Sequence, residues 1–146
     1  MDRLSPIALD TSTIVAGLLA WHEHHEQALQ ALEDAFAGER KVVLPLPSLL
    51  EAYSVMTRLP APHRLSPGDA LALLEDSPLR RSSLVGLPES EGWTFAQTLV
   101  SRRIAGGRTY DALIMACARR GGASQILTLN RRHFEGLDPE VEVVVP

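Results

Sequence analysis

Hydrophobic residues along the chain fall into two kinds of segment. Short, nearly continuous apolar runs predict buried strands at 6–10, 41–46, 83–87, 125–129 and 141–145. Between them, apolar residues recur at helical spacing and predict helices over 14–20, 23–37, 47–59, 89–104 and 109–121, with one more beginning after Ser66. Strands therefore alternate with helices along most of the chain.

Capping signals mark several of the predicted helix boundaries. The hydroxyls of residues 11–13 and of Thr109 can cap the helices that follow them. Ser66 precedes Pro67 and Asp69, an arrangement that is typical of a capped helix start. The glycine pair at 121–122 is the usual punctuation after a helix.

This alternation predicts right-handed strand–helix–strand units in an α/β fold. We expect one domain over residues 1–146, built as a mostly parallel sheet with helices on both faces. Ligands of such folds bind where the strands end, at their carboxyl edge. The residues that follow each strand are therefore the first candidates for a functional site.

Composition and cysteine content narrow the class of protein. Hydrophobic residues make up 45% and charged residues 22% of the 146 positions, as in ordinary globular proteins. Cys117 is the only cysteine, which excludes an intrachain disulfide and a cysteine-rich zinc site. The sequence has no apparent signal peptide and no apolar run of the roughly 18–20 residues needed to span a membrane. We therefore expect a cytoplasmic protein.

Net charge is −4, which by itself argues against general nucleic-acid binding. The basic residues are unevenly distributed, however, because seven of the 14 lie between Ser101 and His133, where Asp111 is the one acid. Arginine is common near helix ends, which is one explanation. A locally positive surface is the other; the seven are Arg102, Arg103, Arg108, Arg119, Arg120, Arg131 and Arg132.

Three acids and an amide occupy informative positions. Asp10 and Asn130 end two predicted strands, while Glu51 and Asp111 lie near the starts of two predicted helices. In a parallel sheet all four can face one crevice. Oxygen ligands suit Mg²⁺ and similar cations, and a bound cation can activate water for attack on a phosphodiester.

Each acid also has a structural explanation. Asp10 can cap a helix, and Asp111 is favoured near a helix N-terminus by the helix dipole. Glu51 lies in an apolar context after Leu49 and Leu50, where a buried unpaired carboxylate would be costly. Spacing alone therefore leaves the metal site as one of several interpretations.

Three segments together resemble PIN-domain ribonucleases of the VapC type, the toxins of VapBC toxin–antitoxin pairs. They are 8–12 (Ala-Leu-Asp-Thr-Ser), 46–60 (from Leu-Pro-Ser-Leu-Leu-Glu-Ala-Tyr to Leu-Pro) and 110–134, which begins Tyr-Asp-Ala-Leu-Ile and ends Thr-Leu-Asn-Arg-Arg-His-Phe. Each piece alone is unspecific, but the ordered set extends over almost the whole chain at the family's spacing.

The resemblance implies a three-layer α/β/α sandwich and an acidic cluster that binds Mg²⁺ or Mn²⁺ and hydrolyses RNA. Asp10, Glu51 and Asp111 match the first three acids of the family. The fourth acid falls at Asn130, a departure that removes about one negative charge and should weaken metal binding or limit the site to one ion rather than two. Thr11, Ser12 and Thr128 match polar positions that support the metal ligands.

The resemblance also implies partners. We expect an RNA substrate, a cognate VapB-like antitoxin and a homodimer, with Arg108, Arg131 and Arg132 as candidates for positioning the RNA backbone. Single-stranded loops are the favoured target, because a protein can reach their bases. The apolar stretch from Leu46 to Val55 is interpreted mainly as core, with a contribution to a partner surface as the alternative.

Two alternative functions remain open, and two lesser motifs have structural explanations. Asn130 is compatible with a catalytically weak PIN-like RNA-binding or interaction module, and an α/β phosphatase is the other alternative. His22 and His25 can share a helix face but lack a third zinc ligand, so a polar helix start is favoured. Cys117 lies on an alanine-rich helix and is expected in the core rather than as a nucleophile.

Overall fold

A computed structural model describes residues 5–146 of the chain. Within these residues five short strands form one sheet in the order β3-β2-β1-β4-β5, and every neighbouring pair is parallel. The strands are β1 (Ile7–Leu9), β2 (Val42–Pro45), β3 (Ser83–Val85), β4 (Gln125–Leu127) and β5 (Glu142–Val144). Each lies inside a range predicted from the apolar runs, and the sheet is wholly rather than mostly parallel.

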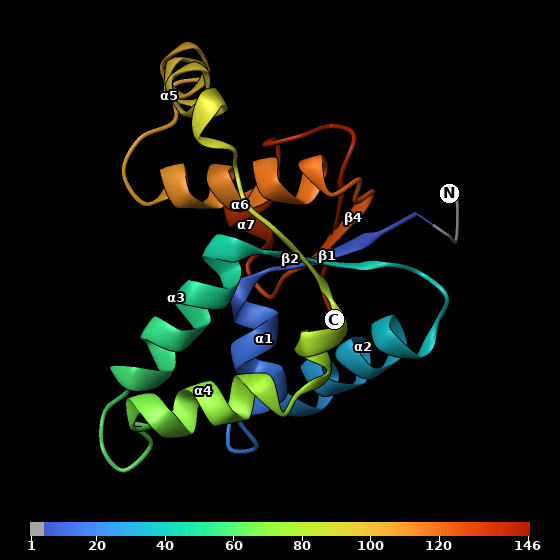
Figure 1. Cartoon of the computed structure of the whole chain (residues 1–146), viewed down its shortest axis with the longest axis vertical. Helices are drawn as coiled ribbons and strands as arrows, with labels where there is room; N and C mark the ends of the chain where they lie inside the picture. The colour runs from blue at the N-terminus through green and yellow to red at the C-terminus, as the bar shows by residue number, and fades with distance from the viewer. Residues whose placement is uncertain (1–4) are drawn as a thin grey trace.

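Helices cover both faces of this sheet (Figure 1). On one side lie α1 (Thr11–Leu18), α2 (His25–Ala37) and α4 (Pro67–Glu75), and α3 (Leu46–Thr57) packs beside α1. On the other side lie α5 (Gly92–Ser101), α6 (Arg108–Arg120) and the short α7 (Arg131–Phe134), with 3-10 turns η1 (Pro78–Arg81) and η2 (Glu89–Glu91) in the connections. The predicted three-layer α/β/α architecture is confirmed.

The central strand shows how the sequence builds the two cores. Ile7 and Leu9 of β1 belong to a buried cluster with α1, α2, α3 and α4, while Ala8 between them joins a second cluster formed with α6. Side chains alternate between the faces of a strand, so a continuous apolar run buries both. The small Ala8 faces α6, whose Ile114 and Met115 fill that side.

Two glycines allow close packing between elements. A Cβ on Gly17 of α1 would lie 2.3 Å from Cδ1 of Leu32, so the absence of a side chain lets α1 and α2 touch. A Cβ on Gly121, at the end of α6, would lie 2.6 Å from Cγ1 of Val43. The first contact packs α1 against α2, and the second packs the end of α6 against β2.

Helix boundaries follow some of the predicted signals and depart from others. Ser66 caps α4 as predicted, since its hydroxyl accepts a hydrogen bond from the Asp69 N–H. Thr109 does not cap α6, because the helix already begins at Arg108 and Thr109 lies inside its first turn. The predicted helix over 89–104 begins instead with a 3-10 turn, and the α-helix starts at Gly92.

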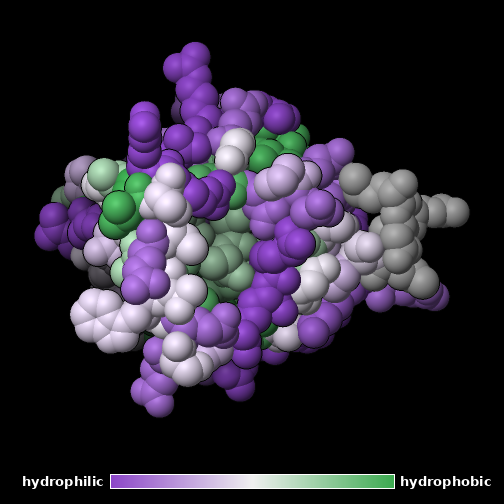
Figure 2. All heavy atoms as spheres, turned by 90° about the horizontal axis from the view of Figure 1, so that it is seen from above, coloured by the Kyte–Doolittle hydropathy of each residue, from purple (hydrophilic) through white to green (hydrophobic). Residues whose placement is uncertain are grey.

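The outer surface is mainly hydrophilic where it is seen from above α5 and α6, with hydrophobic areas that are small and separate (Figure 2).

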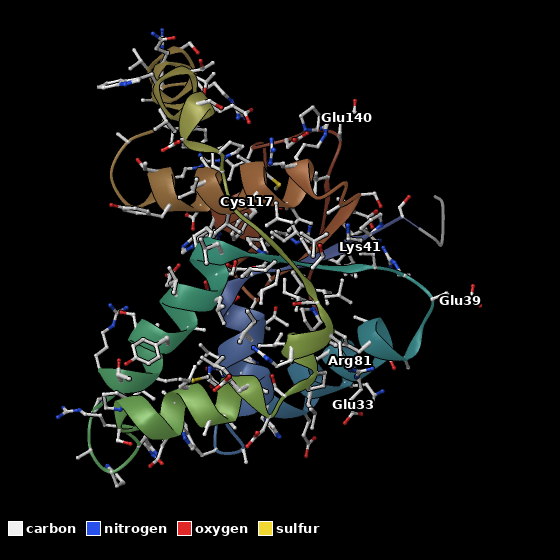
Figure 3. All side chains as sticks on the ribbon, viewed as in Figure 1. Glu33, Glu39, Lys41, Arg81, Cys117 and Glu140 are labelled. Carbon is white, nitrogen blue, oxygen red and sulfur yellow. The ribbon has the colours of Figure 1, made fainter. Side chains whose placement is uncertain are left out.

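On α6, Cys117 is fully buried (Figure 3). Burial raises the pKa of its thiol, an effect that Arg120 partly opposes, so this cysteine is suited to the core and not to nucleophilic chemistry. Among the described residues no helix is both long and apolar enough to cross a membrane.

Candidate metal centre and nucleic-acid cavity

Asp10 lies at the carboxyl edge of the sheet, one residue beyond the central strand. Its backbone N–H donates a 2.9 Å hydrogen bond to the carbonyl of Leu127, the last residue of β4. The residue is only 4% exposed and occupies the N-cap position of α1, but its side chain makes no capping bond. The capping interpretation of Asp10 is therefore wrong for its side chain, which is engaged elsewhere.

Two hydroxyl groups hold that carboxylate from opposite ends of the chain. Ser12 and Thr128 donate to the same oxygen, Oδ2 of Asp10, over 2.8 and 2.7 Å. Each hydroxyl oxygen in turn accepts a backbone N–H, from Leu129 and Asn130 respectively, both over 2.9 Å. Because those oxygens are already acceptors, their hydrogens point at Asp10. Among the described residues, no hydrogen bond reaches the other oxygen of Asp10, Oδ1.

The hydroxyls of residues 11–13 thus do not cap α1 as the sequence suggested. Thr11 instead donates to Oε2 of Glu51 over 3.2 Å, which ties α1 to α3. Glu51 is exposed, so the argument that its carboxylate is buried among apolar neighbours is wrong. Its place on the helix nevertheless brings it to the same edge of the sheet as Asp10.

Asp111 completes the acidic set from the first turn of α6. Burial raises the pKa of Asp111, and the neighbouring carboxylates of Asp10 and Glu51 raise it further, while His133 and Arg108 oppose the change. The ring of His133 approaches it, with 3.8 Å between Nδ1 and Oδ2 of Asp111. The pKa of Asp111 is thus raised mainly by its burial and additionally by repulsion from the other two carboxylates.

That space is an open cavity of about 730 Å³ at the carboxyl edge of the sheet. Asp10, Glu51, Asp111 and Asn130 all line it, together with Thr11 and Ser12, whereas Thr128 lies fully buried behind Asp10. Asn130 is three residues beyond Leu127, the last residue of β4, and occupies the N-cap position of α7. The structure therefore brings together the four polar residues that the sequence singled out.

The donor set fits a hard divalent cation. Three carboxylates and an amide offer oxygen ligands, and a cation would relieve both the burial of the Asp111 carboxylate and its repulsion by Asp10 and Glu51. Within residues 5–146, no three His, Cys, Asp or Glu side chains converge closely enough to enclose an ion by themselves. Mg²⁺ retains several waters and needs only one or two direct carboxylates, so an open arrangement suits it.

The arginine cluster is divided between structural and cavity positions. Arg119 pairs with Asp138 and Arg120 with Glu91, each over 2.8 Å. These acids lie outside the 101–133 window in the sequence, so part of the expected positive surface is neutralised. Two arginines line the cavity, Arg108 and Arg132; Arg131 is not among the described residues that line it, and its Nη1 lies 3.8 Å from Glu135.

Sequence reasoning missed several cavity residues. His22, Glu23 and His24 line the cavity because α2 begins only at His25, leaving them in the turn after α1. The cluster Trp21-His22-Glu23-His24 was visible in the sequence, but its place beside Asp10 depends on where α1 ends. His133 also lines the cavity, and its contact with Asp111 had no sequence signal.

Comparison with known proteins agrees with this geometry. The PIN domain family matches residues 7–138. The chain belongs to the PIN-domain family. Ribonuclease VapC40 of Mycobacterium tuberculosis is 40% identical over 141 residues, which cover 94% of this chain and 98% of that protein. Ribonuclease VapC27 of the same organism is 36% identical over 113 residues, 77% of each chain. The resemblance to VapC-type PIN domains is thus confirmed.

Solved structures share the fold of this PIN domain. The VapBC2 complex of Rickettsia felis, bound to a promoter DNA fragment, contains a chain with a TM-score of 0.68 and 15% identity over 97% of this chain and 98% of that one. The Mycobacterium tuberculosis toxin VapC20, which cleaves the sarcin–ricin loop, has a TM-score of 0.63 and 18% sequence identity. The match covers 82% of this chain and 86% of that one. At these identities the likeness concerns the fold.

Proposed function

We propose that this PIN domain is a metal-dependent endoribonuclease and the toxin of a toxin–antitoxin pair. One observation carries the proposal: Asp10, Glu51 and Asp111 line a single cavity in a chain that is 40% identical to Ribonuclease VapC40 over nearly its full length. We take residues 1–146 as one functional domain. The phosphodiester bond of RNA is the substrate group.

Asp10, Glu51 and Asp111 would hold the cation, Mg²⁺ or Mn²⁺, with Asn130 assisting through its amide oxygen. When bound, the cation supplies Lewis-acid activation of water and charge neutralisation at the phosphate. Ser12 and Thr128 fix Oδ2 of Asp10 and leave Oδ1 for the cavity. Thr11 orients Glu51 through the hydrogen bond to Oε2.

The remaining cavity residues would position the RNA. Arg108 donates to the Glu135 carbonyl over 2.7 Å, which fixes the guanidinium at the cavity wall. Arg132 is exposed and forms no ion pair within the described part of the chain. Both can bind phosphate oxygens and so orient the backbone without reading its sequence. Arg131 would contribute less because Glu135 lies beside it.

We also propose that the protein acts in the cytoplasm, binds a VapB-like antitoxin and forms a homodimer. Related folds have been solved as VapBC complexes, including that of Salmonella typhimurium. Leu46 and Leu50 of α3 are 38% and 57% exposed, while Ala52 and Met56 of the same helix are fully buried. The stretch first interpreted mainly as core thus has an exposed side that can contribute to a partner surface.

Cleavage of total cellular RNA by the purified protein tests the proposal. We expect cleavage with Mg²⁺ or Mn²⁺, none with EDTA, and loss of at least 100-fold in Asp10→Ala and Asp111→Ala, because each removes a ligand. Glu39→Ala is the matched control: this exposed acid precedes β2 at the opposite edge of the sheet (Figure 3). Intact RNA in every metal would favour the interaction module, and release of phosphate from p-nitrophenyl phosphate with RNA intact would favour a phosphatase.

A further inference from the structure

Four aromatic rings form a continuous row that ends at the metal cavity. Trp21 stacks on His63 with ring centroids 4.1 Å apart and planes inclined by 24°. The ring centroids of Trp21 and His22 are 6.0 Å apart, and those of His22 and His24 are 5.8 Å apart. The row therefore joins the turn after α1 to the segment after α3.

The inner half of this row belongs to the cavity that holds the carboxylates. His22 and His24 line that cavity together with Asp10 and Asp111. Trp21 follows outside them and is 47% exposed, and His63 beyond it is also exposed. A tryptophan that is stacked on a histidine beside a polar cavity and leaves nearly half of its surface in solvent is not explained by core packing alone.

Hydrogen bonds fix the turn that carries these rings. Backbone N–H groups of His22 and His25 donate to the carbonyls of Leu19 and His22, each over 3.0 Å. Nδ1 of His25 lies 2.9 Å from the Ala16 carbonyl, and Leu19 is buried. The rings are thus presented by a preorganised turn, which lowers the entropic cost of binding a flat ligand.

The surroundings of His22 favour the neutral form of its ring. Burial lowers the pKa of His22, as do the neighbouring His24 and His25, and Glu23 only partly opposes them. Its Nδ1 accepts the His24 N–H over 3.1 Å, so the remaining proton lies on Nε2. A His22 ring that favours its neutral form suits stacking against a nucleobase, while Arg108 and Arg132 can bind phosphate in the same cavity.

We propose that the row of His63, Trp21, His22 and His24 is a stacking subsite for unpaired bases of the RNA, next to the carboxylates of Asp10 and Asp111. This inference rests on the proposed ribonuclease function and names how the same site engages its substrate. Bases of single-stranded RNA stack on aromatic side chains whatever their identity. The subsite therefore selects unpaired over paired RNA more than it selects a base.

Fluorescence in EDTA tests the subsite without requiring cleavage. The chain has two tryptophans, so Trp93→Phe leaves Trp21 as the sole emitter and does not alter the subsite. The probes are an octamer of riboadenylate and an abasic ribose-phosphate octamer of equal charge. We expect the riboadenylate octamer to quench Trp21, and the abasic octamer to leave it unchanged. The converse variant, Trp21→Phe, reports only Trp93 on α5 and should show no quenching.

Affinity and kinetics give the second measurement. Trp21→Ala should weaken binding of the riboadenylate octamer by about tenfold, the size of one base–aromatic stack, and leave the abasic octamer unaffected. In Mn²⁺ the same variant should raise KM for RNA by about tenfold with kcat within about twofold. Trp21→Phe should restore most of this loss because it keeps an aromatic ring, and Trp93→Ala is the matched control.

Two outcomes separate this inference from the function on which it rests. If wild-type protein cleaves RNA but the Trp21 signal responds equally to both octamers, or Trp21→Ala binds and cleaves as wild type does, the subsite is overturned and the ribonuclease stands. If no RNA is cleaved but the riboadenylate octamer alone quenches Trp21, the subsite stands and the protein is an RNA-binding module.

Discussion

The hydroxyl of Thr128 donates a 2.7 Å hydrogen bond to Oδ2 of Asp10, joining residues 118 positions apart. Thr128 is fully buried, and the N–H of Asn130 occupies its oxygen as a donor. The contact therefore fixes both the orientation of the carboxylate and the path of the chain leaving β4. Residues that hold a metal ligand in place commonly affect affinity almost as much as the ligand does.

Thr128→Val tests this relationship, because it keeps the shape of the side chain and removes the donor. We expect Mn²⁺ affinity, measured by calorimetry, to fall by about 10- to 100-fold, with a parallel loss of RNA cleavage. Thr128→Ser keeps the hydroxyl and should recover most of the affinity. Unchanged Mn²⁺ affinity in Thr128→Val would mean that Ser12 alone is sufficient to orient Asp10.

Asn130→Asp tests the departure from the family's fourth acid. A new carboxylate at the cavity adds one negative charge near Asp10 and Asp111, so Mn²⁺ should bind about tenfold more tightly at neutral pH. Without metal, the new carboxylate should repel Asp10 and Asp111 and so lower the melting temperature of the variant. Calorimetry and thermal unfolding with and without EDTA measure the two effects. Unchanged Mn²⁺ affinity in the variant would show that residue 130 faces the cavity without contributing to the metal site.

The raised pKa of Asp111 predicts how stability depends on pH. The folded state keeps the proton on Asp111 at pH values where the unfolded chain, with its ordinary pKa of 3.8, has lost it. The folded state thus binds more protons across this interval, and stability contributed by Asp111 falls as pH rises through it.

Asp111→Asn should therefore unfold at a higher temperature than wild type at pH 7 in EDTA. The difference should shrink as pH falls towards 3.8, where Asp111 becomes protonated in both states. Added Mg²⁺ should stabilise wild type more than the variant, because the variant lacks one ligand charge. A variant that is less stable than wild type at pH 7 without metal would contradict the assigned repulsion.

Arg132→Ala and Arg131→Ala form a matched pair of neighbouring substitutions. Arg132 lines the cavity, whereas Arg131 lies beside Glu135. Loss of Arg132 should weaken RNA binding and reduce the slope of log affinity against log salt by about 0.7, the value for one phosphate of a single strand. Arg131→Ala should change the slope little. Equal effects in a salt titration would place the RNA over both side chains.

Gly17→Ala should destabilise the fold without touching the site residues. Its Cβ would lie 2.3 Å from Leu32, which must shift within the buried core, so we expect a loss of about 1–3 kcal/mol in urea unfolding. Gly68→Ala in α4 is the control, since nothing lies within 4 Å of its added Cβ and alanine favours a helix. A neutral Gly17→Ala would mean that α1 and α2 can separate at little cost.

The sequence predicted the sheet well because its strands are short, buried and nearly continuous in apolar residues. Asp10 and Asn130 follow two neighbouring strands, so their meeting at one edge followed from parallel topology. Glu51 was assigned correctly to the cavity edge, although the argument from burial was wrong. Its position depends on the angle of α3, which no local pattern encodes.

The sequence did not predict that His22 and His24 line the cavity, for a different reason. His22 and His24 lie there because α1 ends at Leu18 and the next helix begins at His25. A pattern that extends the helix back to residue 23 hides that turn. Likewise, Arg119 and Arg120 find acids from distant segments, so their charge could not be assigned from the composition of residues 101–133 alone.

The central strand of the sheet also has a consequence for protein synthesis. β1 is synthesised before its neighbour β4, and Thr128 follows Asp10 by 118 positions. Until that segment has emerged, Asp10 lacks its buried donor and Asn130 is absent. A nascent or prematurely terminated chain that ends before Thr128 therefore has no finished cavity, so the proposed ribonuclease activity can begin only after the segment from β4 to α7 has been made.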